Sequence, residues 1–333
     1  MTRERAVQEL NPEMGRMGAE DPSRAFPAEP LTGVLCMAYG SPATENDIEA
    51  YYTHIRGGRT PSAEALEELK ARYRAIGGSP LSAITRAQAK AIGDRLGLPA
   101  FVGMKHSPPF IADGAAEARR AGITRLIGLP LAPHFAEMSL GVYERSLAKA
   151  WHGELVFVRG FHNHPGFIKA VQQLVAESLG ESWPDRLFFT AHSLPARIVT
   201  DGDGYHDRLL ESCRLVMVDS LAGMKLPEWE FAFQSASTTG EPWLGPDLLA
   251  AIERSGARDV IVCPIGFVAD HLEILYDLDV EAQAFARSRG IKIRRTESFN
   301  TRPEFIGAMA DVVSDVLSRY EAPATAAPKS PRD

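Results

Sequence analysis

The sequence has little of several features that mark particular classes of protein. Its 333 residues include only three cysteines, Cys36, Cys213 and Cys263, and their wide spacing excludes a disulfide framework and a CxxC zinc pattern. No segment approaches the roughly 18–20 consecutive apolar residues of a membrane-spanning helix. Acidic residues outnumber basic ones by 43 to 36, and a net charge of −7 argues against a nucleic-acid partner. We therefore predict a soluble cytoplasmic protein without a membrane span.

Nucleotide-binding motifs are also missing. The glycine pairs at 57–58 and 77–78 lack the Lys-Ser/Thr of a P-loop, and no GxGxxG follows an apolar run. The composition, with 45% hydrophobic and 24% charged residues, is typical of a globular protein. A single core stops growing near about 250–300 residues, so the length favours two lobes. Residues 1–30 and 321–333 are rich in charge or in alanine and proline, and we predict disordered extensions there.

Short apolar runs alternate with helical patterns along the rest of the chain. Such alternation indicates βαβ units and parallel sheets. The runs lie at 34–40, 100–106, 125–132, 155–161, 186–193, 230–237, 260–268 and 291–297. They divide into two sets of four, and we predict an N-terminal α/β lobe over 31–165 and a second one over 166–320.

The two halves also align with each other. Residues 108–133 lie over 242–267 without a gap, and GVLCMAYGSP lies over RLFFTAHSLP, which makes Tyr39 equivalent to His192. Convergent βα composition is the alternative to a duplication. Open α/β sheets bind ligands outside the carboxyl ends of their strands. We therefore predict one cleft between the lobes, lined by residues that follow strands, such as Tyr39, His192 and His134.

Two groups in this region carry candidate chemistry. His192 ends an apolar run and could accept a proton or bind a metal ion, although a core histidine is the plainer alternative. Glu273, Asp277 and Glu281 recur at i, i+4 and i+8, which predicts one acidic helix face with Asp270 at its mouth. Such a face is either solvated or a line of carboxylates that passes a divalent cation inward. We favour the cation line.

Arginines accompany the glycine-rich turns in HIRGGR and ARYRAIGGSPL. The guanidinium groups of Arg56 and Arg72 suit carboxylate ligands, although surface solubility is the default role of an arginine. Across the predicted cleft, the phenol of Tyr39 could reach the face of a flat ligand opposite His192.

The motifs AYGSP, YYTHIRGGR, RYRAIGGSPL, LAPHF, TAHSLP, PWLGPD and FVADHLEILYDLDVE closely resemble those of ferrochelatases. The similarity runs from Leu31 to Arg319 and is greatest to the soluble Gram-positive type that inserts Fe(II) into coproporphyrin III. It implies a chelatase-like fold of two Rossmann-like lobes, each a four-stranded parallel sheet flanked by helices, with the active-site cleft between them. The last helix is then expected to pack back on the first lobe.

The resemblance assigns roles residue by residue. His192 and Glu273 match the paired catalytic residues that share iron delivery and removal of the pyrrole protons. Tyr39 matches a tyrosine that approaches the metal from the other face, while Asp277 and Glu281 match an outer metal site. The positions that match contacts to the porphyrin and its propionates are Tyr39, Arg56, Arg72, Tyr73, Ser79, Tyr143 and Ser235.

The implied reaction is insertion of Fe(II) into coproporphyrin III to give coproheme, with release of two protons. Fe(II) is then a substrate, no cofactor is bound permanently, and an iron–sulfur cluster is not expected because the last cysteine is Cys263. The resemblance also leads us to expect a monomer that makes transient contacts with neighbouring heme-pathway enzymes. The alternatives are a protoporphyrin IX ferrochelatase, another metal chelatase of the same fold, and a non-catalytic tetrapyrrole carrier.

Overall fold

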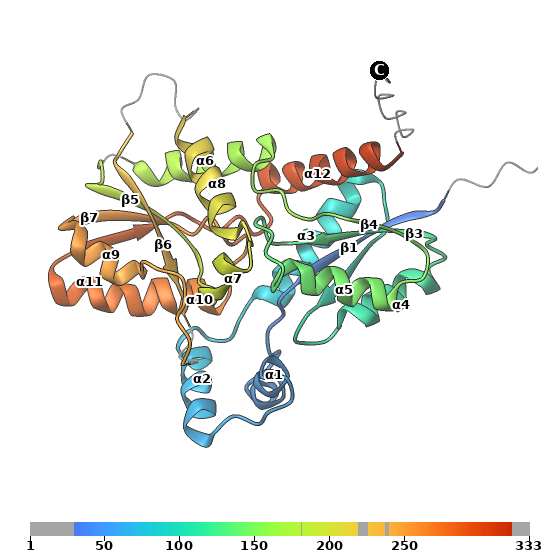
Figure 1. Cartoon of the computed structure of the whole chain (residues 1–333), viewed down its shortest axis with the longest axis horizontal. Helices are drawn as coiled ribbons and strands as arrows, with labels where there is room; N and C mark the ends of the chain where they lie inside the picture. Colours follow the sequence, from blue (N-terminus) through green and yellow to red (C-terminus); the bar gives the residue numbers. More distant parts are fainter. Residues whose placement is uncertain (1–29, 181, 219–225, 237–239, 322–333) are drawn as a thin grey trace, which may run out of the picture. The chain divides into compact units, whose positions relative to one another are not determined.

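Two parallel four-stranded sheets form the framework of the computed structural model, which describes residues 30–180, 182–218, 226–236 and 240–321 (Figure 1). The first sheet has the order β2-β1-β3-β4 and the second the order β6-β5-β7-β8. The strands are β1 (Thr32–Ala38), β2 (Ala100–Met104), β3 (Arg125–Pro130), β4 (Glu154–Phe157), β5 (Arg186–His192), β6 (Trp229–Gln234), β7 (Asp259–Cys263) and β8 (Lys292–Arg295). The same order in both sheets confirms the predicted pair of Rossmann-like lobes.

Helices connect and cover these strands. They are α1 (Ile48–Ile55), α2 (Ala63–Ala75), α3 (Leu81–Leu96), α4 (Ile111–Arg120), α5 (Leu140–Ala150), α6 (Pro165–Leu179), α7 (Arg197–Thr200), α8 (Tyr205–Val218), α9 (Leu248–Ser255), α10 (Leu272–Leu275), α11 (Gln283–Arg289) and α12 (Pro303–Glu321). A 3₁₀ turn at Glu45–Asp47 precedes α1, and a π-helical segment, Asp277–Ala282, joins α10 to α11.

The central strands are apolar because helices cover both of their faces. Every residue of β1 after Gly33 is buried, and β5 is buried from Leu187 to Ala191. Strands of this kind read as continuous hydrophobic runs rather than alternating ones. Only the last residue of β5, His192, emerges from this buried stretch. The burial pattern therefore places a polar side chain at the carboxyl edge of the second sheet.

Local sequence signals fix several helix ends. Ser62 and Asp247 accept hydrogen bonds from the backbone N–H groups of Ala65 and Ala250, so they act as N-caps of α2 and α9. Helix α9 ends at Gly256, whose φ of +70° is the left-handed conformation that glycine adopts most readily. The duplicated helix–strand unit of the second half thus begins and ends where its sequence predicts.

The last helix connects several parts of the core. Helix α12 packs against both α3 and α6 (Figure 1). Its buried residues Phe305 and Met309 belong to one hydrophobic cluster that also contains Ile127 of β3 and Phe189 of β5. Apolar side chains from both sheets are therefore packed into a continuous core, and α12 is part of it.

The chain ends fall largely outside the described residues. The predicted extension at 1–30 overlaps them only at Pro30, and the predicted tail at 321–333 only at Glu321. Glu321 is the last residue of α12 and forms an ion pair with Arg125. The helix therefore reaches one residue further than predicted. In the described ranges, no helix has both the length and the apolar character needed to cross a membrane.

Replacing Phe305 with alanine tests the role of α12 in the core. Phe305 is fully buried and its ring stacks on Phe299 with centroids 4.9 Å apart. We expect Phe305→Ala to lower the free energy of unfolding by about 3–5 kcal/mol, because a cavity is added to the lost burial. Urea denaturation measures this loss. The exposed residue Asp311 on the same helix supplies the control, and Asp311→Ala should change the free energy by less than about 0.5 kcal/mol. Similar losses in the free energy of unfolding for the two variants would contradict the role of α12 in the core.

Candidate active site

His192 lies where the second sheet presents the carboxyl ends of its strands. It is the last residue of β5 and pairs in register with Gln234, the last residue of β6. Its backbone carbonyl accepts a hydrogen bond from the Tyr205 hydroxyl group at 3.1 Å. The side chain is 33% exposed. The strand thus fixes the backbone of His192 and leaves its imidazole at the predicted edge.

Glu273 approaches His192 from the neighbouring connection. It belongs to α10, which follows β7 after a short loop, and its Oε2 lies 2.9 Å from His192 Nδ1. The loop is tied to β5 by a hydrogen bond of 3.0 Å from Gly266 N–H to the Thr190 carbonyl. His271 Nε2 lies 4.0 Å from the same carboxylate oxygen. The structure therefore brings together the two residues predicted to be catalytic.

The pair is electrostatically coupled. Burial lowers the pKa of His192, but the charge and the hydrogen bond of Glu273, with a smaller effect of Asp277, raise it overall. Burial raises the pKa of Glu273, but the charges of His192 and His271 and the hydrogen bonds of His192 and Ser235 lower it overall. Glu273 therefore stays ionised, and His192 is a stronger base than a free imidazole. When neutral His192 donates Nδ1–H to Glu273, its Nε2 keeps a free lone pair.

The acidic segment departs from the predicted helix. A single α-helical face was expected to carry Glu273, Asp277 and Glu281. Instead Glu273 lies in α10, and the other two lie in the π-helical segment, where Glu281 N–H bonds to the Tyr276 carbonyl at 2.9 Å. This i→i+5 bond widens the turn and breaks the regular i+4 spacing. The prediction of one continuous α face is therefore wrong, and Glu281 is exposed.

Asp277 lies between Glu273 and the surface-exposed Glu281. Its carboxylate accepts a short hydrogen bond from the Ser235 hydroxyl group, and Ser235 has a φ of +62°, which is unusual for a residue with a side chain. Burial raises the pKa of Asp277 to about 7; the charge of Glu273 adds to the rise, while Ser235 and Arg72 oppose it. Ser235 therefore contacts Asp277 of the acidic segment, and its contact with the porphyrin stays a prediction.

Asp270 has a structural role in this arrangement. Its carboxylate accepts hydrogen bonds from Ser298 Oγ at 2.6 Å and Asn300 Nδ2 at 2.8 Å, and Arg295 lies 3.5 Å away. These partners hold Asp270 in the loop that precedes α10. Across the part of the chain that the structure describes, no group of three or more His, Cys, Asp or Glu side chains has an arrangement that could hold a metal ion.

Tyr39 approaches from the first sheet. It follows β1, is 41% exposed, and packs its ring against His106 with centroids 4.5 Å apart. Burial of its hydroxyl group, then the charge of Glu273 and the nearby Tyr73, raises its pKa. The Tyr39 hydroxyl group is thus within electrostatic reach of Glu273. Lys105 Nζ lies 5.7 Å from the ring centroids of both Tyr39 and Tyr143, which is buried on α5.

The other predicted porphyrin contacts lie on α1, α2 and the turn that follows. Arg56 ends α1 with its guanidinium 5.6 Å from the ring of Tyr52. On α2, Arg72 pairs with Glu68 and lies 5.2 Å from the Tyr276 ring, which places it close to Asp277. Tyr73 is buried edge-on against Tyr51, and the half-buried Ser79 accepts a bond from Leu81 N–H.

Two histidines that follow strands have surroundings that the sequence does not reveal. His134 was expected to line the cleft, but it is buried, and its Nε2 lies 2.9 Å from Ser212 Oγ on α8. His106 was not singled out, yet it packs on Tyr39, and its Nδ1 lies 2.9 Å from that of His54. Burial, and then Lys105 and His54, lower the pKa of His106 to about 3. Its place directly after β2 was the available signal.

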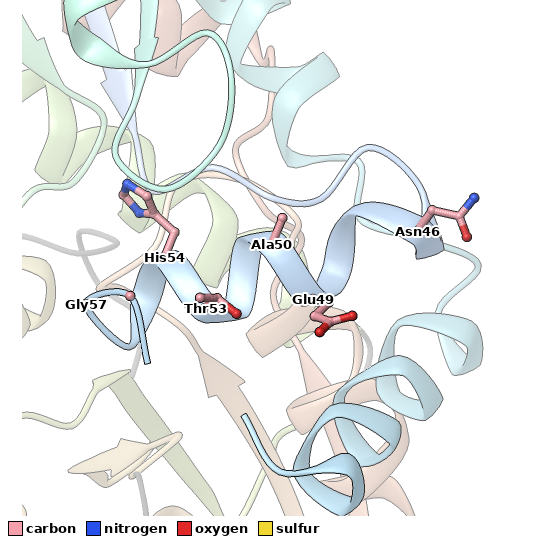
Figure 2. Close-up of a pocket in the computed structure, with 7 residues that line it drawn as sticks. Asn46, Glu49, Ala50, Thr53, His54 and Gly57 are labelled. Atoms are coloured by element: carbon pink, nitrogen blue, oxygen red, sulfur yellow. The ribbon is translucent and has the colours of Figure 1, made fainter. Parts of the chain in front are cut away.

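A hollow of about 900 Å³ runs along the face of α1 (Figure 2). Figure 2 shows Asn46, Glu49, Ala50, Thr53 and His54 at successive turns of this face. Gly57 and Gly58 complete its lining. The hollow therefore lies beside the His54–His106 contact rather than at the His192–Glu273 pair.

The two sheets and the strand-end site define a chelatase fold. The structure of SirB from Bacillus subtilis with Fe³⁺ superposes with a TM-score of 0.56, covering 87% of this chain and 97% of that one at 12% identity. SirB from Bacillus subtilis subspecies spizizenii in complex with cobalt gives 0.51, covering 86% and 96% at 12% identity. Identities this low show the fold alone.

Sequence comparison gives the family. The family model named Ferrochelatase matches residues 31–317. The coproporphyrin III ferrochelatase of Bacillus subtilis is 40% identical over 308 residues, covering 86% of this chain and 98% of the relative. A ferrochelatase of Herpetosiphon aurantiacus is 37% identical over 304 residues, covering 85% and 98%. The chain belongs to the ferrochelatase family of enzymes, as its motifs predicted.

The raised pKa of Asp277 predicts a pH-dependent effect of Asp277→Asn. The ordinary value is 3.8 and the folded value about 7, so the folded state binds more protons than the unfolded state between these limits. Wild-type stability should therefore fall as the pH rises through this window. The variant stays neutral, and its gain in melting temperature over wild type should grow from pH 4 to pH 7 and then level off. Thermal melts in buffer with a chelator measure this gain.

Asp279→Asn is the matched control. Asp279 lies in the same π-helical segment but is exposed and pairs with Arg295. The Asp279→Asn variant should show no gain in melting temperature that grows with pH. If the gain in melting temperature of Asp277→Asn did not depend on pH, the raised pKa of Asp277 would be contradicted.

Proposed function

We propose that this chain inserts Fe(II) into coproporphyrin III, releasing the two pyrrole N–H protons and forming coproheme. The observation that carries the proposal is the contact of His192 with Glu273 at a sheet edge, with Asp277 and Glu281 following along the chain. The family supports metal insertion. Several relatives about 40% identical are coproporphyrin III ferrochelatases, which supports the substrate.

His192 is proposed as the base. Its Nδ1 is engaged by Glu273, so Nε2 is the nitrogen available to take a pyrrole proton or to contact Fe(II). Glu273 stabilises the imidazolium that forms, which fits the raised pKa of His192. Each porphyrin nitrogen that loses its proton becomes a ligand for the incoming metal, so a base beside the metal is required on this face.

The carboxylates are proposed to deliver the metal. Fe(II) can exchange between carboxylate oxygens when each site offers only part of a coordination shell. Glu281 is exposed, Asp277 is half-buried and Glu273 contacts the base. This order leads from solvent to the reacting nitrogens. Asp277 can also take up a proton near neutral pH, which lets it release the metal to Glu273.

The substrate side is proposed to use the cationic and phenolic groups of the first lobe. Coproporphyrin III carries four carboxylates. The nearby cations are Arg56 beside Tyr52, Arg72 beside Tyr276, and Lys105 beside Tyr39 and Tyr143. Guanidinium groups bind carboxylates through paired hydrogen bonds. Tyr39 would then contact the macrocycle face opposite His192. This arrangement favours the four-carboxylate porphyrin over protoporphyrin IX, which has two.

Anaerobic spectrophotometry tests the reaction and its substrate. With Fe(II) present, we expect the metalloporphyrin Soret shift with coproporphyrin III, at a higher kcat/KM than with protoporphyrin IX. A preference for protoporphyrin IX would contradict the proposed substrate. Binding of either porphyrin without a metallation shift would contradict the proposed enzymatic activity and indicate a tetrapyrrole carrier.

Replacing His192 tests the base. We expect His192→Ala to lower the insertion rate by at least about 100-fold, because general base catalysis commonly contributes that much. Porphyrin affinity, measured by fluorescence quenching, should change by less than about twofold. The exposed His152 provides the control, and His152→Ala should insert iron at the wild-type rate. Wild-type turnover by the His192 variant would show that another group is the base.

A further inference from the structure

The main chain of Glu273 is held by a buried glutamine from the neighbouring strand. Gln234 ends β6, is 4% exposed, and donates a hydrogen bond from Nε2 to the Glu273 carbonyl oxygen at 2.8 Å. Helix α10 has only four residues, and its N-cap residue His271 makes no side-chain capping bond. The position of Glu273 therefore depends on contacts from outside its own helix, and Gln234 supplies one of them.

The amide of Gln234 is itself oriented by Thr190. The Thr190 hydroxyl group is fully buried and donates to Gln234 Oε1 at 2.8 Å. Because this bond occupies the amide oxygen, the amide nitrogen is directed to the Glu273 carbonyl. Thr190 lies two residues before His192 on β5, so both side chains lie on the same face of the strand. One row of hydrogen bonds thus joins the strand that carries His192 to the backbone of Glu273.

We propose that Thr190 and Gln234 are positioning residues that set the distance between His192 and Glu273. The inference rests on the proposed function, in which this pair removes the pyrrole protons and hands over the metal. A carboxylate that holds an imidazole in place must be held itself. Without the Thr190 hydroxyl group the Gln234 amide can rotate, and the start of α10 loses one of its hydrogen bonds to the sheet. Displacement of Glu273 then weakens its 2.9 Å bond to His192.

Thr190 allows a matched pair of substitutions. Thr190→Val keeps the shape but removes the hydroxyl group, whereas Thr190→Ser keeps the hydroxyl group. We expect Thr190→Val to lower kcat for iron insertion about tenfold, the lower end of the effect of losing such supporting bonds, with KM for the porphyrin changed less than about twofold. Thr190→Ser should retain at least about half of the wild-type kcat. Gln234→Met, which loses the Nε2 donor without adding a charge, should resemble Thr190→Val.

Gln88 supplies the control for lost stability. It is also fully buried, and its Nε2 donates to the carbonyls of Asn300 at 2.7 Å and Val268 at 3.3 Å, so it anchors the same region without contacting Glu273. Gln88→Met should lower the melting temperature but leave kcat within about twofold of wild type. Equal losses of kcat in Gln88→Met and Thr190→Val would show that lost stability explains the effect of Thr190→Val. That result would overturn the proposal.

The NMR signal of the His192 Nδ1 proton gives a readout that does not need turnover. In Thr190→Val and Gln234→Met, this signal should move upfield as the 2.9 Å bond to Glu273 weakens, and Thr190→Ser should match wild type. An unchanged proton signal and unchanged kcat in both variants would overturn the positioning role. A wild-type protein that inserts no iron would overturn the proposed function instead, and the proton signal would still decide whether the two residues position Glu273.

Discussion

The hydrogen bond between His192 Nδ1 and Glu273 Oε2 is the contact on which the site depends. It joins the end of β5 to the connection that follows the adjacent strand β7, so it forms only if both strands end at the same edge. The imidazole and the carboxylate are both partly buried, so each loses hydration, and each recovers that loss mainly through the other. Both backbones therefore have to be held in place, and Tyr205 of α8 and Gln234 of β6 do so by hydrogen bonds to the carbonyl groups of His192 and Glu273.

Much of the fold could be predicted because buried parallel strands have a simple sequence pattern. β1 and β5 are the central strands of their sheets, and both are runs of apolar residues followed by a polar side chain at the sheet edge. The alignment of the two halves is enough to place Tyr39 and His192 at matching strand ends. The shared strand order of the two sheets confirms this correspondence.

The details of the site could not be predicted, because they depend on contacts between distant residues. A position after a strand indicates the sheet edge but not the partner, so His134 was expected to line the cleft although it is buried against Ser212. The hydrogen bonds of Asp270 to Ser298 and Asn300 could not be predicted either. The π-helical turn escaped detection because Glu273, Asp277 and Glu281 have a spacing that suits an α-helix. Likewise, nothing local indicates that Gln234 reaches the backbone of Glu273.

The surroundings of Asp277 have an energetic consequence. Without a cation, Asp277 sits close to the charge of Glu273 and beside Ser235, whose backbone is in the left-handed region. Both features raise the free energy of the folded state. A divalent cation would relieve the repulsion but would have to displace a proton from Asp277 near neutral pH, which limits how tightly it binds. In the proposed function, a carboxylate with these properties suits transfer of a metal ion better than storage, because a transfer site must release its ion to the next ligand.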